Sequence, residues 1–163
     1  MNEKLLKALN KQINMEWYSG YLYLSMATYF EAQNLSGFAS WMDAQAHEEF
    51  GHAMKIYGYI HSRLGRVTLK GIDAPKTDWE SPLAVFEDAF AHEQAVTASI
   101  SSIVDLAMDI KDHATRNFLN WFVSEQVEEE ESVDKVVQKL KMVKGMPHGL
   151  YMLDRELAQR KAH

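Results

Sequence analysis

Hydrophobic residues recur at alternating steps of three and four along four long stretches of the chain. The first stretch runs through Leu6, Leu9 and Ile13 to Tyr23 and Phe30 on this spacing. Such steps keep side chains on one face of an α-helix, as in packed helical bundles. The pattern predicts helices at about residues 4–33, 37–64, 82–111 and 113–142.

The connections between these stretches predict the topology. Residues 65–81 hold two glycines and a proline with little periodicity, and the pair Ser81 and Pro82 then signals the start of a helix. A 28-residue helix is about 42 Å long, whereas 17 extended residues reach about 56 Å. The connection can therefore run the length of the bundle, which would leave the second and third helices parallel.

We therefore expect an all-α protein, a four-helix bundle with one long crossover and a short C-terminal fifth helix. Residues 1–145 would form the four-helix bundle. Gly145 and Pro147 would end the fourth long helix. Residues 146–163 would form the short amphipathic helix and a tail within the same domain.

Each long helix carries a carboxylate at a core-facing position near its middle. These residues are Glu16, Glu49, Glu93 and Glu129. Each lies about 11 to 16 residues into its helix, so all four are expected at one level of the bundle. Burying one unpaired charge costs several kcal/mol, and four would exceed the total stability of a typical domain, about 5–15 kcal/mol. Cations would remove that cost.

The neighbouring donors indicate which cations would bind. His52 follows Glu49 by three positions and Gln126 precedes Glu129 by three, so each pair shares a helix face. Oxygen and nitrogen donors without sulfur favour two iron, manganese or zinc ions over calcium. Two ions about 3.5–4 Å apart need a bridging carboxylate, for which Glu49 is the best placed. The alternative, a water-bridged polar network in the core, is disfavoured by the matched depth of the acids.

Five segments of the chain carry a more specific signal. They are NMEWYS at 14–19, YLYLSMA at 21–27, HEEFGHAMK at 47–55, HEQ at 92–94 and FLNWFVSEQVEEE at 118–130. At these segments the chain resembles the non-haem ferritins of bacteria and archaea, over essentially its whole length. The resemblance implies a ferritin-like four-helix bundle with a di-iron ferroxidase centre.

The resemblance also implies a role for individual residues. The first iron site would use Glu16, Glu49 and His52, and the second would use Glu49, Glu93 and Glu129 with Gln126 alongside. A third, weaker iron site would use Glu48, Glu125, Glu128 and Glu129. Tyr23 matches a tyrosine near the di-iron centre, although core packing explains it equally well.

The implied function is iron storage. The protein would oxidise Fe(II) to Fe(III) with dioxygen and deposit ferric mineral inside a hollow shell, a homo-oligomer of 24 subunits. The haem-carrying bacterioferritins have a histidine where Glu129 stands and a methionine where Phe50 stands, so no haem is expected. The apolar residues Leu150, Met152, Leu153 and Leu157 in the tail helix suggest an assembly contact.

Two other functions remain open from the residues alone. A di-metal oxidase or oxygenase would need a substrate pocket beside the metals, where Phe86, Phe90 and Phe122 are expected to close the core. A non-catalytic metal-buffering bundle could hold zinc. A zinc-protease motif is excluded because His47 and His52 are five positions apart, about 140° around a helix.

Several polar residues have simpler interpretations. Glu48, Glu125 and Glu128 could form a solvated helix face. The sequence also predicts that Glu130 and Glu131 lie in solvent and that His92 is an ordinary surface or capping residue.

Composition limits which partners, metal sites and cellular locations can be expected. The chain has 163 residues and a net charge of −6, which argues against nucleic-acid and anionic-membrane partners. It contains no cysteine, which excludes disulfides and thiolate metal sites. No apolar run reaches the roughly 18 residues of a membrane span and no signal peptide is recognisable, so a cytoplasmic location is expected.

Overall fold

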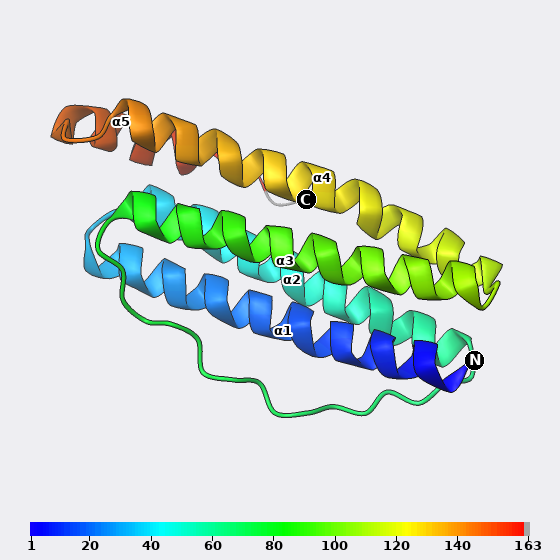
Figure 1. The fold of residues 1–163 in the computed structure, drawn as a ribbon. Helices are drawn as coiled ribbons and strands as arrows, with labels where there is room; N and C mark the ends of the chain where they lie inside the picture. The colour runs from blue at the N-terminus through cyan, green and yellow to red at the C-terminus, as the bar shows by residue number, and fades with distance from the viewer. Residues whose placement is uncertain (162–163) are drawn as a thin grey trace.

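The computed structural model describes residues 1–161, which form five α-helices and no strands (Figure 1). The helices are α1 (Glu3–Ala32), α2 (Ser36–Ser62), α3 (Pro82–Asp109), α4 (His113–Met142) and α5 (Pro147–Leu157). Each long helix begins and ends within two residues of its predicted bounds. The all-α four-helix bundle with a short fifth helix is therefore confirmed. Positions 162 and 163 of the predicted tail lie outside the described residues.

Side-chain caps set most of the helix starts. Asn2 accepts hydrogen bonds from the backbone N–H groups of Lys4 and Leu5, and Ser81 accepts one from Ala84. These bonds satisfy N–H groups that the helix itself leaves without a partner. The start of α2 differs, because Leu35 precedes its first residue, Ser36, and provides no side-chain cap.

The long connection crosses over as predicted (Figure 1). Three side chains of α1 bind it in sequence: Asn10 donates to the carbonyl of Arg66, Asn14 to that of Gly71, and Ser25 to that of Lys76. The connection thus runs in the same direction as α1, while α2 runs antiparallel to α1 (Figure 1). As a result α3 starts where α2 starts, and the two helices are parallel.

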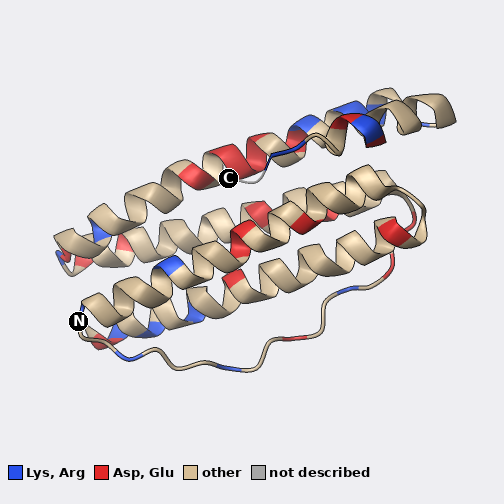
Figure 2. Cartoon of the chain, turned by 180° about the vertical axis from the view of Figure 1, so that it is seen from behind, with Lys and Arg blue, Asp and Glu red and all other residues tan. Residues whose placement is uncertain are grey.

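The core has an apolar cluster at each end and a polar layer between them. One cluster contains Tyr23, Phe30 and Phe86, and the other contains Leu5 and Ile56. Along every long helix the one buried glutamate falls between the positions that contribute to these two clusters. Figure 2 shows acidic residues of neighbouring helices at this middle level. The fold therefore concentrates buried charge at one depth.

The short helix α5 folds back against α2. Leu153 and Leu157 are buried in the core of this chain, so the expectation that these two leucines form an assembly contact is wrong. Asp154 accepts a 2.9 Å hydrogen bond from the N–H of Phe38. Tyr151 and Met152 remain more than half exposed. No helix in residues 1–161 is both long and apolar enough to cross a membrane.

Candidate metal centre

Six side chains of the polar layer are the predicted ligands, and each long helix contributes at least one. They are Glu16 from α1, Glu49 and His52 from α2, Glu93 from α3, and Gln126 and Glu129 from α4. All are buried, His52 being the most exposed at 5%. The sequence predicted all six, and the structure brings them together.

Their donor atoms form two groups that share one residue. One group joins Glu16, Glu49 and His52, and the other joins Glu49, Glu93 and Glu129, with one donor atom per residue and all atoms of a group within 4.8 Å of one another. The carboxylate of Glu49 therefore lies where it could contact two cations at once. This is the arrangement expected of a bridging ligand.

Two carboxylate oxygens in this layer have no hydrogen-bond partner. They are Oε2 of Glu16 and Oε1 of Glu129, both buried. Buried polar atoms in proteins are almost always hydrogen-bonded, and an unpaired carboxylate oxygen is especially costly. The available lone pairs, with the imidazole of His52, make a donor set that suits two divalent cations of the iron, manganese or zinc type.

The pKa values of the polar layer indicate that cations would replace protons there. Burial acts against charge on His52, but the neighbouring carboxylates of Glu16 and Glu49 outweigh it and raise the pKa of His52 to about 11. Burial and then the charge of Glu93 raise the pKa of Glu129 to about 8 and hold that of Glu49 well above its usual value. Without cations the layer therefore retains protons, which incoming cations would displace.

Outer hydrogen bonds orient the carboxylates. Gln12 donates to Glu16 at 3.0 Å, and Gln45 donates to Glu49 at 3.0 Å and to Glu129 at 2.6 Å. Neither glutamine is among the ligands or supports predicted from the sequence. Each lies four residues before its glutamate, so the helical spacing was an available signal.

Two further bonds fix Glu93. The hydroxyl of Tyr23 donates to one of its oxygens at 2.6 Å, and the amide of Gln126 donates to the other at 3.1 Å. Burial and then the charge of Glu93 raise the pKa of Tyr23 well above its usual value. Tyr23 therefore remains a hydrogen-bond donor at neutral pH.

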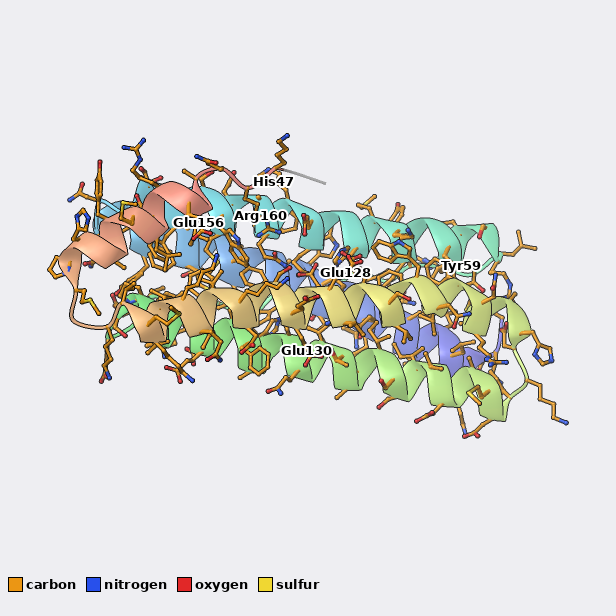
Figure 3. All side chains as sticks on the ribbon, turned by 90° about the horizontal axis from the view of Figure 1, so that it is seen from above. His47, Tyr59, Glu128, Glu130, Glu156 and Arg160 are labelled. Atoms are coloured by element: carbon orange, nitrogen blue, oxygen red, sulfur yellow. The ribbon has the colours of Figure 1, made fainter. Side chains whose placement is uncertain are left out.

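The residues expected at a third iron site are only partly brought together. Glu125 joins His52 and Glu129 in a third close group of donor atoms, with 3.8 Å between Nε2 of His52 and the Glu125 carboxylate. Glu48 instead pairs with Arg160 at 3.1 Å. Glu128 is exposed on α4 (Figure 3) and belongs to none of the close groups in residues 1–161. The third site stays a prediction.

Two predictions about surface residues are wrong. His92 is half-buried and lies 2.6 Å from the hydroxyl of Ser19, and burial lowers its pKa. Glu130 is also half-buried, because it accepts a 2.7 Å hydrogen bond from Thr97 on α3. Each is adjacent in sequence to a ligand candidate, and each contacts a neighbouring helix because its own helix packs closely there.

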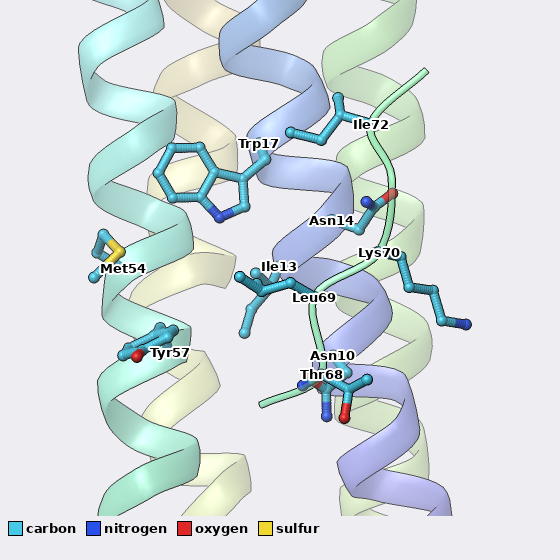
Figure 4. Close-up of a pocket in the computed structure, with 10 residues that line it drawn as sticks. All are labelled: Asn10, Ile13, Asn14, Trp17, Met54, Tyr57, Thr68, Leu69, Lys70 and Ile72. Atoms are coloured by element: carbon cyan, nitrogen blue, oxygen red, sulfur yellow. The ribbon is translucent and has the colours of Figure 1, made fainter. Parts of the chain in front are cut away.

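An outer pocket lies between α1, α2 and the crossover connection (Figure 4). Trp17, Met54 and Leu69 are among the residues that line it. None of the six predicted ligands in the polar layer does so. This pocket therefore gives an organic substrate no access to the candidate metal centre.

Known proteins are similar to this chain in sequence and in fold. The family model for the ferritin-like domain matches residues 6–143. A bacterial non-heme ferritin of Bacteroides fragilis (strain 638R) is 44% identical over 160 residues, which cover 98% of this chain and 99% of the relative. One of Staphylococcus aureus (strain USA300) is 38% identical over 160 residues, covering 98% and 96%.

Solved structures agree with these relatives. An open pore ferritin from the hyperthermophilic archaeon Archaeoglobus fulgidus has a TM-score of 0.98 and 48% identity, with 99% of each chain covered. A closed form of the Archaeoglobus fulgidus ferritin, engineered by site-directed mutagenesis, has a TM-score of 0.99 at the same identity, covering 100% of this chain and 99% of that one. With four buried acids and a histidine converging between its helices, this chain belongs to the ferritin family.

Proposed function

We propose that the protein stores iron and oxidises Fe(II) at the buried polar layer before storage. The observation that carries this proposal is the sharing of Glu49 between two groups of donor atoms. The names of the relatives support it, since they are non-heme ferritins. Iron is then the substrate, with two ions per chain at the centre.

The side chains divide between the two ions. Glu16 and His52 would hold the first Fe(II), Glu93 and Glu129 the second, and Glu49 both. Four carboxylates balance the charge of two divalent cations, and Gln126 and Tyr23 hold Glu93 in place. Each Fe(II) gives up one electron, and dioxygen takes up two electrons and two protons to form hydrogen peroxide. The anionic ligands favour the Fe(III) product, which is the harder cation.

Outer acids would take part in moving iron. Glu125 lies closest to the centre, in contact range of His52. With Glu48 and Glu128 it would form the third, weaker iron position. The exposure of Glu128 supports a role at the entry to or exit from the centre.

Storage requires a container, and we propose a hollow homo-oligomeric shell of 24 subunits. The near-complete match to ferritin chains supports this. The exposed side chains of Tyr151 and Met152 on α5 are available for contacts between subunits. The cytoplasmic location and the assignment of the whole chain to one domain stay predictions.

Stopped-flow mixing of anaerobically Fe(II)-loaded protein with dioxygen tests the proposal. Wild-type protein should oxidise two Fe(II) per chain rapidly, and Glu49→Ala and His52→Ala should each slow this phase by about 10-fold or more. His47→Ala is the matched control, since His47 is an exposed histidine on the same helix. Wild-type rates in the Glu49 and His52 variants would refute the assigned centre. Tight metal binding without oxidation would instead identify a metal buffer.

A further inference from the structure

The C-terminal segment brings a positive charge onto α2 beside the candidate metal centre. Arg160 donates to the carboxylate of Glu48 at 3.1 Å and to the amide oxygen of Gln45 at 2.8 Å. It also donates to the backbone carbonyl of Trp41 at 3.2 Å, and its guanidinium lies 4.2 Å from the centre of that indole ring. Figure 3 shows Arg160 beside α2.

These contacts are shielded from water. The side chain of Arg160 is 14% exposed and that of Glu48 is 11% exposed. The planar guanidinium has five N–H donors in a fixed geometry, which allows it to serve three acceptors together. Arg160 is therefore held in one place and is not a mobile surface charge.

Gln45 connects Arg160 to the centre. Its amide oxygen accepts from Arg160, so its amide nitrogen must face the other way, toward the carboxylates of Glu49 and Glu129. Gln45 is fully buried. Without Arg160 its oxygen would lose the hydrogen bond that favours this orientation of the amide.

At Glu48, Arg160 makes the carboxylate less available to a cation. One of its oxygens is taken by Arg160, while the other is buried without a hydrogen-bond partner. A cation at this carboxylate would have to compete with the guanidinium and sit close to its positive charge.

We infer that Arg160 is a positioning residue that separates the affinities of the two kinds of cation position. Through Gln45 it strengthens cation binding at the two-ion centre, and by occupying Glu48 it weakens binding at the outer position. Iron would then fill the centre before Glu48. The inference rests on the proposed function, because it assumes that the centre takes up cations.

Removal of Arg160 distinguishes this role from a general electrostatic effect. Loss of a nearby positive charge alone would tighten cation binding at both positions. Loss of a positioning residue should weaken the centre by about 10-fold, a typical effect of outer hydrogen-bond partners on metal affinity. The two positions should therefore respond in opposite directions.

Calorimetric titration of the assembled protein with Zn²⁺ measures both affinities without any oxidation. The outer position is identified as the binding step that Glu48→Gln abolishes. Arg160→Met should weaken the inner steps by about 10-fold and tighten the outer step. Arg155→Met is the matched control, because Arg155 is an exposed arginine nearby on α5.

A second variant separates the two contacts. Arg160→Lys retains the positive charge, but it lacks the planar guanidinium that lies 4.2 Å from the Trp41 ring and places Nη2 between Glu48 and Gln45. It should weaken the inner steps and leave the outer step near the wild-type value. In a Gln45→Met background, Arg160→Met should no longer affect the inner steps.

Unchanged affinities in Arg160→Met, or a shift of both positions in the same direction, would overturn the inference. The proposed function fails on a different result. A protein that binds Zn²⁺ but leaves Fe(II) unoxidised would refute ferroxidase activity and leave the result for Arg160 standing.

Discussion

The hydroxyl of Tyr23 on α1 donates a 2.6 Å hydrogen bond to the carboxylate of Glu93 on α3, and both side chains are completely buried. The bond ties an aromatic residue of the apolar core to a ligand candidate in the polar layer. Packing and support of the centre are therefore both functions of Tyr23, and a single substitution can separate them.

Replacing Tyr23 with phenylalanine should keep the packing and remove the bond. We expect a stability loss of about 1 kcal/mol, the usual net value of one hydrogen bond, and weaker binding at the cation position held by Glu93. Chemical unfolding and Zn²⁺ titration measure the two effects. Tyr21→Phe is the control, since Tyr21 is about half exposed on the same helix. Equal metal affinities in the Tyr23 and Tyr21 variants would leave Tyr23 with packing alone.

The bridging role of Glu49 predicts a difference between two glutamates. Glu49→Gln should weaken both cation positions, whereas Glu16→Gln should weaken only the first, because Glu16 belongs to one group of donor atoms. Equilibrium dialysis with Zn²⁺ counts the ions retained per chain. Loss of one ion in both variants would contradict the bridge.

Much of this centre was accessible from the sequence. The helical periodicity placed Glu16, Glu49, Glu93 and Glu129 on core-facing positions at equal depth, and depth along a helix depends only on residue count. The long connection determined which helices run parallel. These features depend only on the spacing and number of residues along the chain, which is why they could be predicted.

The contacts that depend on tertiary packing could not be predicted. Arg160 reaches Gln45 only because α5 folds back along α2. Nothing in the periodicity of the tail specifies the direction in which α5 runs. The sequence predicts surface positions for His92 and Glu130, because polar residues usually lie there. Their partners, Ser19 and Thr97, are on other helices.

Two glycines of α2 offer a direct test of how α5 is seated. A methyl group on Gly37 would lie 1.7 Å from the backbone carbonyl oxygen of Asp154, whereas one on Gly51 would meet nothing within 4 Å. Gly37→Ala should cost about 1–3 kcal/mol through overpacking. Gly51→Ala should stabilise the helix by about 0.5–1 kcal/mol. Thermal unfolding compares them, and equal melting temperatures would contradict the close approach of α5 to α2.

The ion pair between Arg63 and Asp112 predicts a pH dependence of stability. Its two nitrogen–oxygen contacts are both 3.1 Å, and the hydrogen bonds from Arg63 lower the pKa of Asp112 below its usual value. A lowered pKa stabilises the fold above the unfolded-state pKa of about 3.9, and this contribution is lost as the pH falls through the folded-state value.

Asp112→Asn isolates this ion pair, because asparagine can still cap α4 by accepting from the N–H of Thr115. We expect the variant to be less stable than wild type by up to about 1 kcal/mol near neutral pH, and the gap to close as the pH falls through the lowered folded-state pKa of Asp112. Urea unfolding across this range measures the gap. A gap of the same size at both ends would show that charge is not its source.

Direct localisation of iron tests the central claim, that the buried acids converge to hold two cations. Crystals of the wild-type protein should be loaded with Fe(II) without oxygen and measured at the iron absorption edge. Two anomalous peaks per chain are expected, one beside Glu16, Glu49 and His52 and the other beside Glu49, Glu93 and Glu129. Iron bound only elsewhere, with these side chains hydrogen-bonded to one another, would contradict the account.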